Sequence, residues 1–313
     1  MECIRGLYNI HPRDRGAVAT IGNFDGFHEG HRQLIAQLRA RAAECGAPTL
    51  VILFEPQPPE YFQGAKAQTR LMRLSAKLRA FRKAGVDRVL ALRFDARLAA
   101  LSAEAFVDQV MVGALGVRGL VIGDDFRFGA GRRGDFAMLA ARGREHGFFV
   151  ESTPTFSDGS ARISSTRLRA ALAQGDMREA ARLIGAPYAY TGRVVSGDAR
   201  GRQLGFPTAN VLMPEPPPLA GVFAVMVAVQ GGGEYPGIAN VGRRPTVGGG
   251  RVLLEAHLLD FQGDLYGRRL DVRFLERLRA ERKFPSLAAL QAQIEQDREA
   301  AQRFFAIRGL EAL

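Results

Sequence analysis

The sequence changes its pattern once, near residue 186, and this change constrains the possible folds more than any other feature. Before it, short apolar runs alternate with longer stretches that carry apolar residues at helical spacing. The pattern predicts strands at 17–21, 49–54, 88–92, 119–122 and 148–152, and helices at 30–45, 75–85, 102–115 and 135–147. Because alternating strands and helices form parallel sheets covered on both faces, we expect an α/β fold, closed by two short helices at 164–173 and 176–184.

After residue 186 the chain is rich in Gly, Pro and Val, and turn residues separate its short apolar segments. This pattern of short apolar segments separated by turn residues predicts an antiparallel β-barrel or β-sandwich. A last amphipathic stretch, 286–305, predicts a helix. The expected fold class is therefore α/β plus β, with one domain at residues 1–185 and a second at residues 186–313.

The charge balance limits the classes of partner. The net charge of +11 comes from 43 Lys and Arg against 32 Asp and Glu. Such a balance is compatible with binding nucleic acid or polyanionic small ligands, and also with a general bias of the composition toward arginine. The arginines are scattered and form no basic tract, so we expect no nucleic-acid partner. No apolar run approaches a membrane span, no secretory signal is visible, and Cys3 and Cys45 are the two cysteines. We expect a cytoplasmic protein without a membrane partner, and the oligomeric state stays open.

The stretch "GNFDGFHEGH" (22–31) directly follows the first predicted strand. A zinc site would need further ligands, and the other histidines, His11, His146 and His257, form no cluster with it. A role in capping a helix is a second alternative. The third is an anion site: the turn exposes backbone N–H groups, and the next helix directs its positive end at them. His28 and His31, three residues apart, can then both donate to a phosphate. We favour this phosphate site, which has no Walker lysine because no G-x-x-x-x-G-K-[ST] occurs in the chain.

Two further stretches suit a nucleotide and a flat ring. "RISSTRLR" (162–169) places three hydroxyls and two arginines at the start of a predicted helix, which favours a second anion-binding end over a simple serine cap. In "FEPQPPEYF" (54–62), Phe54, Tyr61 and Phe62 with the prolines form either ordinary core or a rigid apolar wall for a heteroaromatic ring.

The second domain has its own candidate site in "GDARGRQLGFPTAN" (197–210). A glycine-rich basic turn precedes a strand that presents Thr208 and Asn210 on one face. Their neutral oxygens suit Mg²⁺, which takes most of its other ligands from water and nucleotide phosphates, although a structural turn is the alternative. Glu255 and His257 share one face of a later strand. An acidic side chain there is either a salt-bridged strand residue or a base for an attacking hydroxyl.

These stretches carry a resemblance to a known family. "GNFDGFHEGH", "FEPQPPEYF", "VIGDDFRFGAGRRGD" (121–135) and "RISSTRLR" resemble, in this order, the adenylyltransferase half of the bacterial bifunctional riboflavin kinase/FAD synthetases, within the nucleotidylyltransferase superfamily. The block ending in "PTAN", with "GVFAV", "IANVGRRPT", "EAHLLDFQGDLYG" and "RLRAERKF" after it, resembles the riboflavin kinase half. The resemblance covers essentially the whole chain. It departs at Phe223, where the family usually has tyrosine, and at Arg282, where lysine is usual.

The resemblance implies a Rossmann-like nucleotidylyltransferase domain followed by a β-barrel flavokinase domain that ends in a helix. The implied substrates are riboflavin, FMN and ATP, with Mg²⁺ as cofactor. The barrel would phosphorylate riboflavin to FMN, and the first domain would adenylylate FMN to FAD with a second ATP, releasing pyrophosphate. A nucleotidylyltransferase with another substrate and a non-catalytic nucleic-acid or regulatory protein are the two alternatives.

Residue by residue, the resemblance assigns the following sites. ATP in the first domain is expected at Gly22, Asn23, Phe24, Asp25, His28, Gly30, His31, Asp125, Arg162, Ser164, Ser165 and Thr166. The flavin is expected there at Phe54, Pro56, Pro58, Phe62, Asp124 and Phe128. ATP in the second domain is expected at Gly197, Gly201, Arg202, Gly205, Thr208 and Asn210, of which Thr208 and Asn210 also hold Mg²⁺. The expected catalytic residues are His28, His31 and Arg162 in the first domain and Glu255, as general base, in the second.

Overall fold

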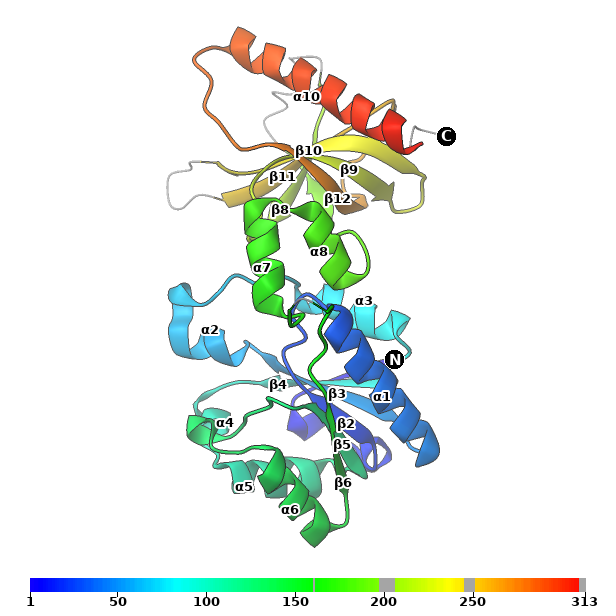
Figure 1. The fold of residues 1–313 in the computed structure, drawn as a ribbon, viewed down its shortest axis with the longest axis vertical. Helices are drawn as coiled ribbons and strands as arrows, with labels where there is room; N and C mark the ends of the chain where they lie inside the picture. The colour runs from blue at the N-terminus through cyan, green and yellow to red at the C-terminus, as the bar shows by residue number, and fades with distance from the viewer. Residues whose placement is uncertain (160, 197–205, 245–250, 310–313) are drawn as a thin grey trace. The chain divides into compact units, whose positions relative to one another are not determined.

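The computed structural model describes residues 1–159, 161–196, 206–244 and 251–309 (Figure 1). The chain forms two compact units. The first unit comprises Met1–Gln68 and Met72–Ser165, and the second comprises Thr69–Leu71 and Thr166–Leu313. None of the described helices combines the length and the apolar character that crossing a membrane requires.

The first unit is built on a six-stranded sheet with the order β1-β4-β3-β2-β5-β6, in which every pair of neighbours is parallel. The strands are β1 (Glu2–Arg5), β2 (Val18–Ile21), β3 (Thr49–Glu55), β4 (Arg88–Arg93), β5 (Gly119–Gly123) and β6 (Phe149–Thr153). The predicted parallel α/β sheet is confirmed. Strand β1 was not predicted, because it is a short edge strand in which only Ile4 is buried.

Helices cover both faces of this sheet (Figure 1). They are α1 (Glu29–Glu44), α2 (Pro58–Gln63), α3 (Leu74–Lys83), α4 (Ala96–Ala99), α5 (Ala103–Phe106), the π-helix η4 (Val107–Ala114) and α6 (Phe136–His146). Short 3-10 turns lie at Leu7–Asn9, Pro12–Asp14, Gly64–Lys66 and Ala130–Arg132. Apolar residues of α1 and α3 pack on one face of the strands, and those of α5, η4 and α6 pack on the other. The four inner strands β2 to β5 are therefore buried on both faces, which explains their continuous apolar runs.

The helix expected at 102–115 is an α-helical turn that continues as a π-helix. The Arg15 guanidinium lies at its carboxyl end and donates to the carbonyl oxygens of Val112, Gly113 and Ala114. The last carbonyls of a helix lack partners further along it, and the arginine supplies one from outside; the Val112 carbonyl also accepts from the N–H of Gly116 at 3.1 Å. The apolar spacing of the sequence does not reveal this wider helical turn, because Val107, Val110 and Met111 are buried in either form.

The second unit is a closed antiparallel barrel with the order β10-β11-β8-β7-β12-β9. Its strands are β7 (Ala189–Val195), β8 (Ala209–Met213), β9 (Gly221–Val229), β10 (Glu234–Arg244), β11 (Arg251–Leu258) and β12 (Arg269–Arg279), and the helix α10 (Leu287–Arg308) follows them. The barrel and the final helix confirm the sequence prediction. Phe223 is fully buried inside the barrel, and its ring meets that of Phe274 edge-on at 5.3 Å between centroids.

Helices α7 (Ser165–Gln174) and α8 (Met177–Ile184) were expected to close the first domain, but α8 packs against β12 of the barrel. Arg277 of β12 also donates to the carbonyl of Gln174 at 3.1 Å. The division between the compact units therefore falls at Ser165 and Thr166, before the expected boundary at residue 185. Met177, Ala180 and Leu183 give α8 an apolar face. The sequence pattern predicts this face, but it does not show whether the face packs against the first or the second domain.

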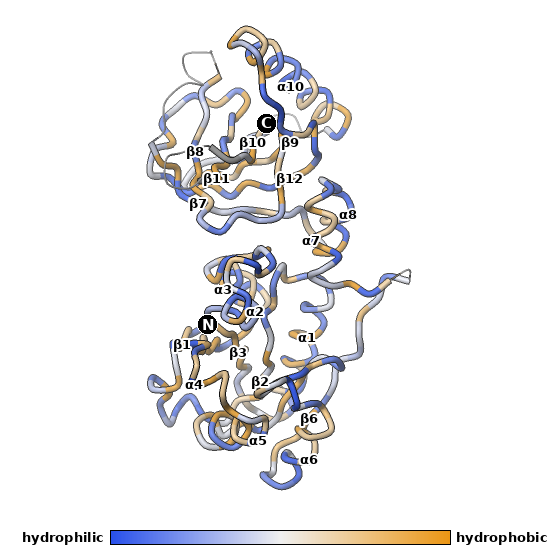
Figure 2. Tube along the Cα trace, turned by 90° about the vertical axis from the view of Figure 1, so that its left-hand side faces the viewer, coloured by the Kyte–Doolittle hydropathy of each residue, from blue (hydrophilic) through white to orange (hydrophobic). Residues whose placement is uncertain are grey.

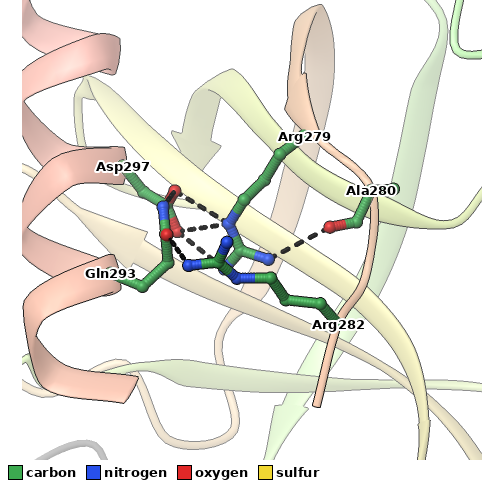
Figure 3. A network of polar contacts seen from close by, with 5 residues as sticks. All are labelled: Arg279, Ala280, Arg282, Gln293 and Asp297. Carbon is green, nitrogen blue, oxygen red and sulfur yellow. Dashed lines mark hydrogen bonds and ion pairs between the residues drawn. The ribbon is translucent and has the colours of Figure 1, made fainter. Parts of the chain in front are cut away.

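Helix α10 attaches to the barrel through an apolar and a polar contact. Hydrophobic and hydrophilic residues both occur along it (Figure 2), and Ala301 and Phe305 pack on outward-facing residues of β9 and β10. Nearer its start, Asp297 accepts hydrogen bonds from Arg279 Nε at 2.9 Å and Nη2 at 2.8 Å, and Gln293 Nε2 donates to the same carboxylate at 2.8 Å (Figure 3). Arg282 donates to Gln293. An arginine at this position, where the similar family usually has lysine, therefore keeps a cation in the network.

Removing the Asp297 carboxylate is expected to destabilise the second unit. In Asp297→Ala the Arg279 guanidinium loses its carboxylate partner. Because Asp297 is only 5% exposed, we expect the loss to lower the free energy of unfolding by about 3 kcal/mol. Urea denaturation measures the change. The matched control is Glu299→Ala, which removes the exposed Arg303–Glu299 pair of the same helix and changes stability by about 0.5 kcal/mol or less. Equal effects of the two variants would contradict this account of the network.

Candidate functional site

A cavity of about 270 Å³ lies at the carboxyl edge of the parallel sheet. The chain passes from β2 to β3 on one side and later returns to β5 on the other side of β2. In open α/β sheets, such a reversal leaves a crevice where ligands bind. The residues after β2, β5 and β6 and those before α7 line the cavity: Ile21, Gly22, Phe24, His28, Gly30, His31, Leu34, Gly123, Asp124, Asp125, Phe126, Thr153, Pro154, Thr155, Phe156, Arg162, Ile163, Ser164 and Ser165.

Most of the residues assigned to ATP in the first domain line this cavity, and three do not. Asn23 and Asp25 belong to the same turn, but the Asn23 carbonyl accepts from Lys77 and the buried Asp25 carboxylate accepts from the backbone N–H of Met72. Thr166 is the second residue of α7 and begins the second compact unit. Of the residues assigned to the flavin, Asp124 lines the cavity.

The turn after β2 has an unusual backbone. Phe24 (φ 48°), Gly26 (φ 86°) and Phe27 (φ 39°) all adopt left-handed conformations, which are unfavourable for the two phenylalanines. The turn ends at His28, the residue before α1, whose carbonyl accepts from the N–H groups of His31 and Arg32. His28 and His31 therefore lie one helical turn apart, and their rings stack with 3.7 Å between centroids.

Burial keeps both histidines neutral. Burial, and then the nearby Arg162, lowers the pKa of His28 to about 4. Burial, followed by His28 and the Lys77 ammonium, lowers the pKa of His31 well below its ordinary value. The Nδ1 atoms of both rings are buried, and neither has a hydrogen-bond partner within the described part of the chain. Because buried polar atoms are normally paired, these two fit a ligand that supplies hydrogen-bonding oxygens.

Charged and hydroxyl groups face the histidines across the cavity. Arg162 pairs with Asp125, while Asp124 accepts hydrogen bonds from the Thr155 hydroxyl at 2.8 Å and its N–H at 2.9 Å. The Thr155 hydroxyl is the main reason that the pKa of Asp124 lies below its usual value. Ser165 donates its hydroxyl to the carbonyl of Asp25 at 2.7 Å, which ties the start of α7 to the histidine turn. The cavity thus offers neutral donors, one guanidinium and carboxylates.

The residues of the predicted aromatic wall are not among those that line this cavity. Phe54, Tyr61 and Phe62 surround Phe94, with ring centroids 5.6, 5.4 and 5.7 Å from it, so their packing is compatible with both core and ligand wall. Phe62 is 67% exposed, which is unusual for a large apolar ring and favours the wall. Pro56 precedes α2 and Pro58 begins it. Phe128 stacks at 5.5 Å on Phe126, which itself lines the cavity.

In the barrel, three polar residues occupy one row across neighbouring strands. Asn210 of β8 lies opposite Glu255 of β11, and Glu255 lies opposite Asn240 of β10. Residues directly opposite in antiparallel strands project from the same face. Asn210 is 6% exposed, and its Oδ1 has no hydrogen-bond partner among the described residues. A buried carbonyl oxygen without a donor fits a ligand of Mg²⁺.

Thr208 lies just outside β8, is exposed, and lines a second cavity of about 90 Å³ with Phe261 and Tyr266 among its other residues. The segment before it is held by His257, whose Nδ1 lies 2.8 Å from the Pro207 carbonyl oxygen. The expected kinase residues Gly197, Gly201, Arg202 and Gly205 lie outside the described residues. Within the described ranges, no group of three or more His, Cys, Asp and Glu side chains is placed to hold a metal.

Several residues in or next to these two sites were not predicted from the sequence. The segment 153–156 could have been found, since β6 was predicted and its carboxyl end lies at the same edge of the sheet as those of β2 and β5. Asn240 could not, because its place beside Glu255 depends on the strand register. Lys77 reads as an exposed helix residue in the sequence, yet it is 1% exposed.

Two family models match this chain: FAD synthetase over residues 10–167 and riboflavin kinase over residues 184–305. Bifunctional riboflavin kinase/FMN adenylyltransferase of Escherichia coli K12 is 50% identical over 309 residues, which cover 98% of this chain and 99% of the relative. The protein of that name from Haemophilus influenzae is 46% identical over 306 residues, with 97% and 99% covered. A crystal structure described as a macrolide-efflux protein from Streptococcus pneumoniae has a TM-score of 0.82 and 30% identity, covering 96% of this chain and 98% of its own.

The low pKa of His28 predicts a loss of stability in mild acid. Between pH 6.5 and about 4 the unfolded chain binds a proton at His28 that the folded chain does not, so stability falls as the pH drops through this window. By pH 5 the loss due to His28 is about 2 kcal/mol, since one pKa unit corresponds to about 1.4 kcal/mol. His28→Gln should lose correspondingly less stability between pH 7 and pH 5 in urea denaturation.

The control for this prediction is His11→Gln, which changes an exposed histidine away from the cavity and is expected to follow the wild-type curve. If His28→Gln and wild type lose the same free energy of unfolding between pH 7 and pH 5, His28 is not the group that takes up the proton.

Proposed function

This chain belongs to the family of bifunctional riboflavin kinase/FMN adenylyltransferases, and we propose that each compact unit carries one of the two activities in that name. The second unit phosphorylates riboflavin to FMN with ATP. The first unit transfers the adenylyl group of a second ATP to FMN, which gives FAD and pyrophosphate. One observation supports this division above all: each unit holds buried polar atoms without partners among the described residues, the Nδ1 atoms of His28 and His31 in the first and Oδ1 of Asn210 in the second.

In the first unit the FMN phosphate attacks the α-phosphorus of ATP, and the bond to the β-phosphate breaks. His28 and His31 donate hydrogen bonds to phosphate oxygens, and as neutral rings they do so without taking up a proton near pH 7. Arg162 provides positive charge at the same cavity. The start of α1 adds the positive end of a helix dipole. No covalent intermediate is needed, because catalysis consists of orienting the phosphates and stabilising their charge.

The two aromatic groups bind the flavin in this proposal. Phe54 and Phe62, with Pro56 and Pro58 between them in the chain, form an apolar wall suited to the isoalloxazine ring. Asp124 and Phe128 contribute from the segment after β5. The exposed ring of Phe62 supports this assignment, since burying it under a flat ligand removes apolar surface from water.

In the second unit, Thr208 and Asn210 hold the Mg²⁺ that accompanies ATP. The ATP phosphates are bound by residues of the glycine-rich stretch before them: Gly197, Gly201, Arg202 and Gly205. When bound, Mg²⁺ neutralises phosphate charge during transfer. Glu255 accepts the proton of the ribityl 5′-hydroxyl as that oxygen attacks the γ-phosphorus. Its place opposite Asn210 in the strand register supports this role, because both side chains then face the same ligand.

The remaining proposals concern where the protein works. Riboflavin, FMN and ATP are its partners. Neither nucleic acid nor a membrane is needed to account for the net charge of +11, because FMN and ATP carry negatively charged phosphates. Both cysteines, Cys3 and Cys45, are free, which supports a reducing cytoplasm.

Asn210→Ala is expected to abolish FMN formation from riboflavin while leaving the conversion of supplied FMN to FAD within about twofold of wild type. The variant removes the buried carbonyl oxygen that fits Mg²⁺ and leaves the first unit unchanged. Incubation with riboflavin or FMN, ATP and Mg²⁺, followed by chromatography of the flavins, measures both steps. Asn210→Asp is the matched control, since it keeps an oxygen ligand and should retain more kinase activity. If the wild-type protein forms neither FMN nor FAD, the proposed function is refuted.

The double variant His28→Ala with His31→Ala is expected to do the reverse, so that FMN accumulates. Loss of a preorganised donor to a charged transition state lowers kcat by about 10²-fold or more, and FAD formation from FMN should fall at least that far. Riboflavin phosphorylation in the same preparation is the internal control. A folded double variant that loses both activities would show that the two sites are not independent.

A further inference from the structure

The face of helix α3 that points toward the histidine turn carries two buried side chains, neither of which lines the cavity. Lys77 is 1% exposed and Phe81 is fully buried, and the two lie one helical turn apart on the same face. Neither has been assigned a part in binding or catalysis. A lysine is rarely buried this completely, because its ammonium loses water, so its position calls for an explanation.

The turn that these residues face is strained. Phe24 and Phe27 both have positive φ angles, and each such conformation costs about 1–2 kcal/mol for a residue other than glycine. A conformation of this kind persists only when its surroundings determine it. The turn immediately precedes His28 and α1, so its geometry decides where the two imidazole rings lie.

Phe81 holds the strained turn through its aromatic rings. Its ring meets Phe24 at 5.3 Å and 84° and meets Phe27 at 5.4 Å and 90°, both edge-to-face arrangements. Phe24 and Phe27 in turn contact the ring of His31, with centroids 5.1 and 6.5 Å away. A continuous set of rings therefore runs from α3 through the strained residues to the histidine pair.

Lys77 holds the same turn through its backbone. Its Nζ donates to the carbonyl oxygen of Asn23 at 2.7 Å, directly before the first residue with positive φ. Its charge also contributes, after burial and His28, to the low pKa of His31, so the lysine favours the neutral ring. The backbone bond and the ring contacts act on adjacent residues, Asn23 and Phe24, and thus fix the start of the turn from two directions.

We propose that α3 positions the histidine pair for adenylyl transfer, with Lys77 and Phe81 as positioning residues that touch neither substrate. This proposal rests on the adenylyltransferase activity proposed above for the first unit. Lys77 fixes the Asn23 carbonyl, Phe81 separates and orients the two phenylalanine rings, and the turn between them presents His28 and His31 to the phosphates. Displacement of a catalytic group by about 1 Å can reduce a rate by about 10²-fold, so this support matters for kcat.

Two variants of the full-length protein test the proposal. Lys77→Met removes the ammonium but keeps an unbranched chain, and Phe81→Leu removes the ring edges but keeps an apolar core residue. FAD formation from supplied FMN should fall about 10- to 100-fold in kcat with the KM for FMN within about twofold, while riboflavin phosphorylation stays within about twofold of wild type. The matched control is Lys83→Met, an exposed lysine of the same helix, which should behave as wild type in both reactions.

A spectroscopic measurement separates positioning from general loss of stability. The chain has 5 histidines, so their ring resonances can be followed individually by NMR. In Lys77→Met and Phe81→Leu the resonances of His28 and His31 should shift, and those of His146 and His257 should not. A variant that loses FAD formation without such shifts, or that loses both activities together, would overturn the proposal.

The outcomes also distinguish this proposal from the proposed function. Failure of the wild-type protein to convert FMN to FAD refutes the adenylyltransferase activity itself. Wild-type FAD formation, together with full activity of the folded Lys77→Met and Phe81→Leu variants, refutes only the role of α3. If Lys77→Met does not fold, Phe81→Leu decides the question by the same two measurements, because it keeps an apolar side chain in the core and leaves no buried polar group without a partner.

Discussion

The strand order of the parallel sheet is the constraint on which the first unit depends. The chain adds β3 and β4 on one side of β2 and then crosses to add β5 and β6 on the other. The connections after β2 and β5 therefore diverge, and their residues surround a space that neither fills. The histidine turn, the pair Asp124 and Asp125, and the segment after β6 meet at this place although they are far apart in sequence. Without this order, the same residues would form separate surface loops.

The barrel reaches a comparable result by another route. Its strands lie next to each other in register, so Asn210, Glu255 and Asn240 form a row without any crevice between diverging loops. The candidate site of the first unit thus consists of buried side chains at the end of a sheet, whereas that of the second consists of oxygen-bearing side chains on neighbouring strands. The difference agrees with the sites proposed above, in which the kinase site would need oxygen ligands for a hard cation and the adenylyltransferase site would need donors for phosphate oxygens.

Much of the fold and part of the site could be predicted from the sequence. Strands β2 to β5 are buried on both faces, so their apolar runs stand out, and the glycine-rich turn after β2 points to an anion site by its position alone. The edge strand β1 has little apolar character, and the π-helix at 107–114 shares its apolar spacing with an α-helix, so neither was visible. The pairing of α8 with β12 and the burial of Lys77 depend on the packing of distant segments. The conformation of Phe24 and Phe27 is equally hidden, because nothing in their identity favours a positive φ.

The barrel pairs its first strand, β7, with its last, β12. During synthesis, the barrel cannot close until the segment up to Arg279 has left the ribosome, and the outward-facing apolar residues of β9 and β10 stay uncovered until α10 follows. The six strands of the parallel sheet, in contrast, are complete at Thr153. Since domains generally fold in the order in which they are made, the sheet is assembled while the barrel still lacks its closing strand. The nascent chain therefore exposes unpaired barrel edges on β7 and β9 until β12 has been made.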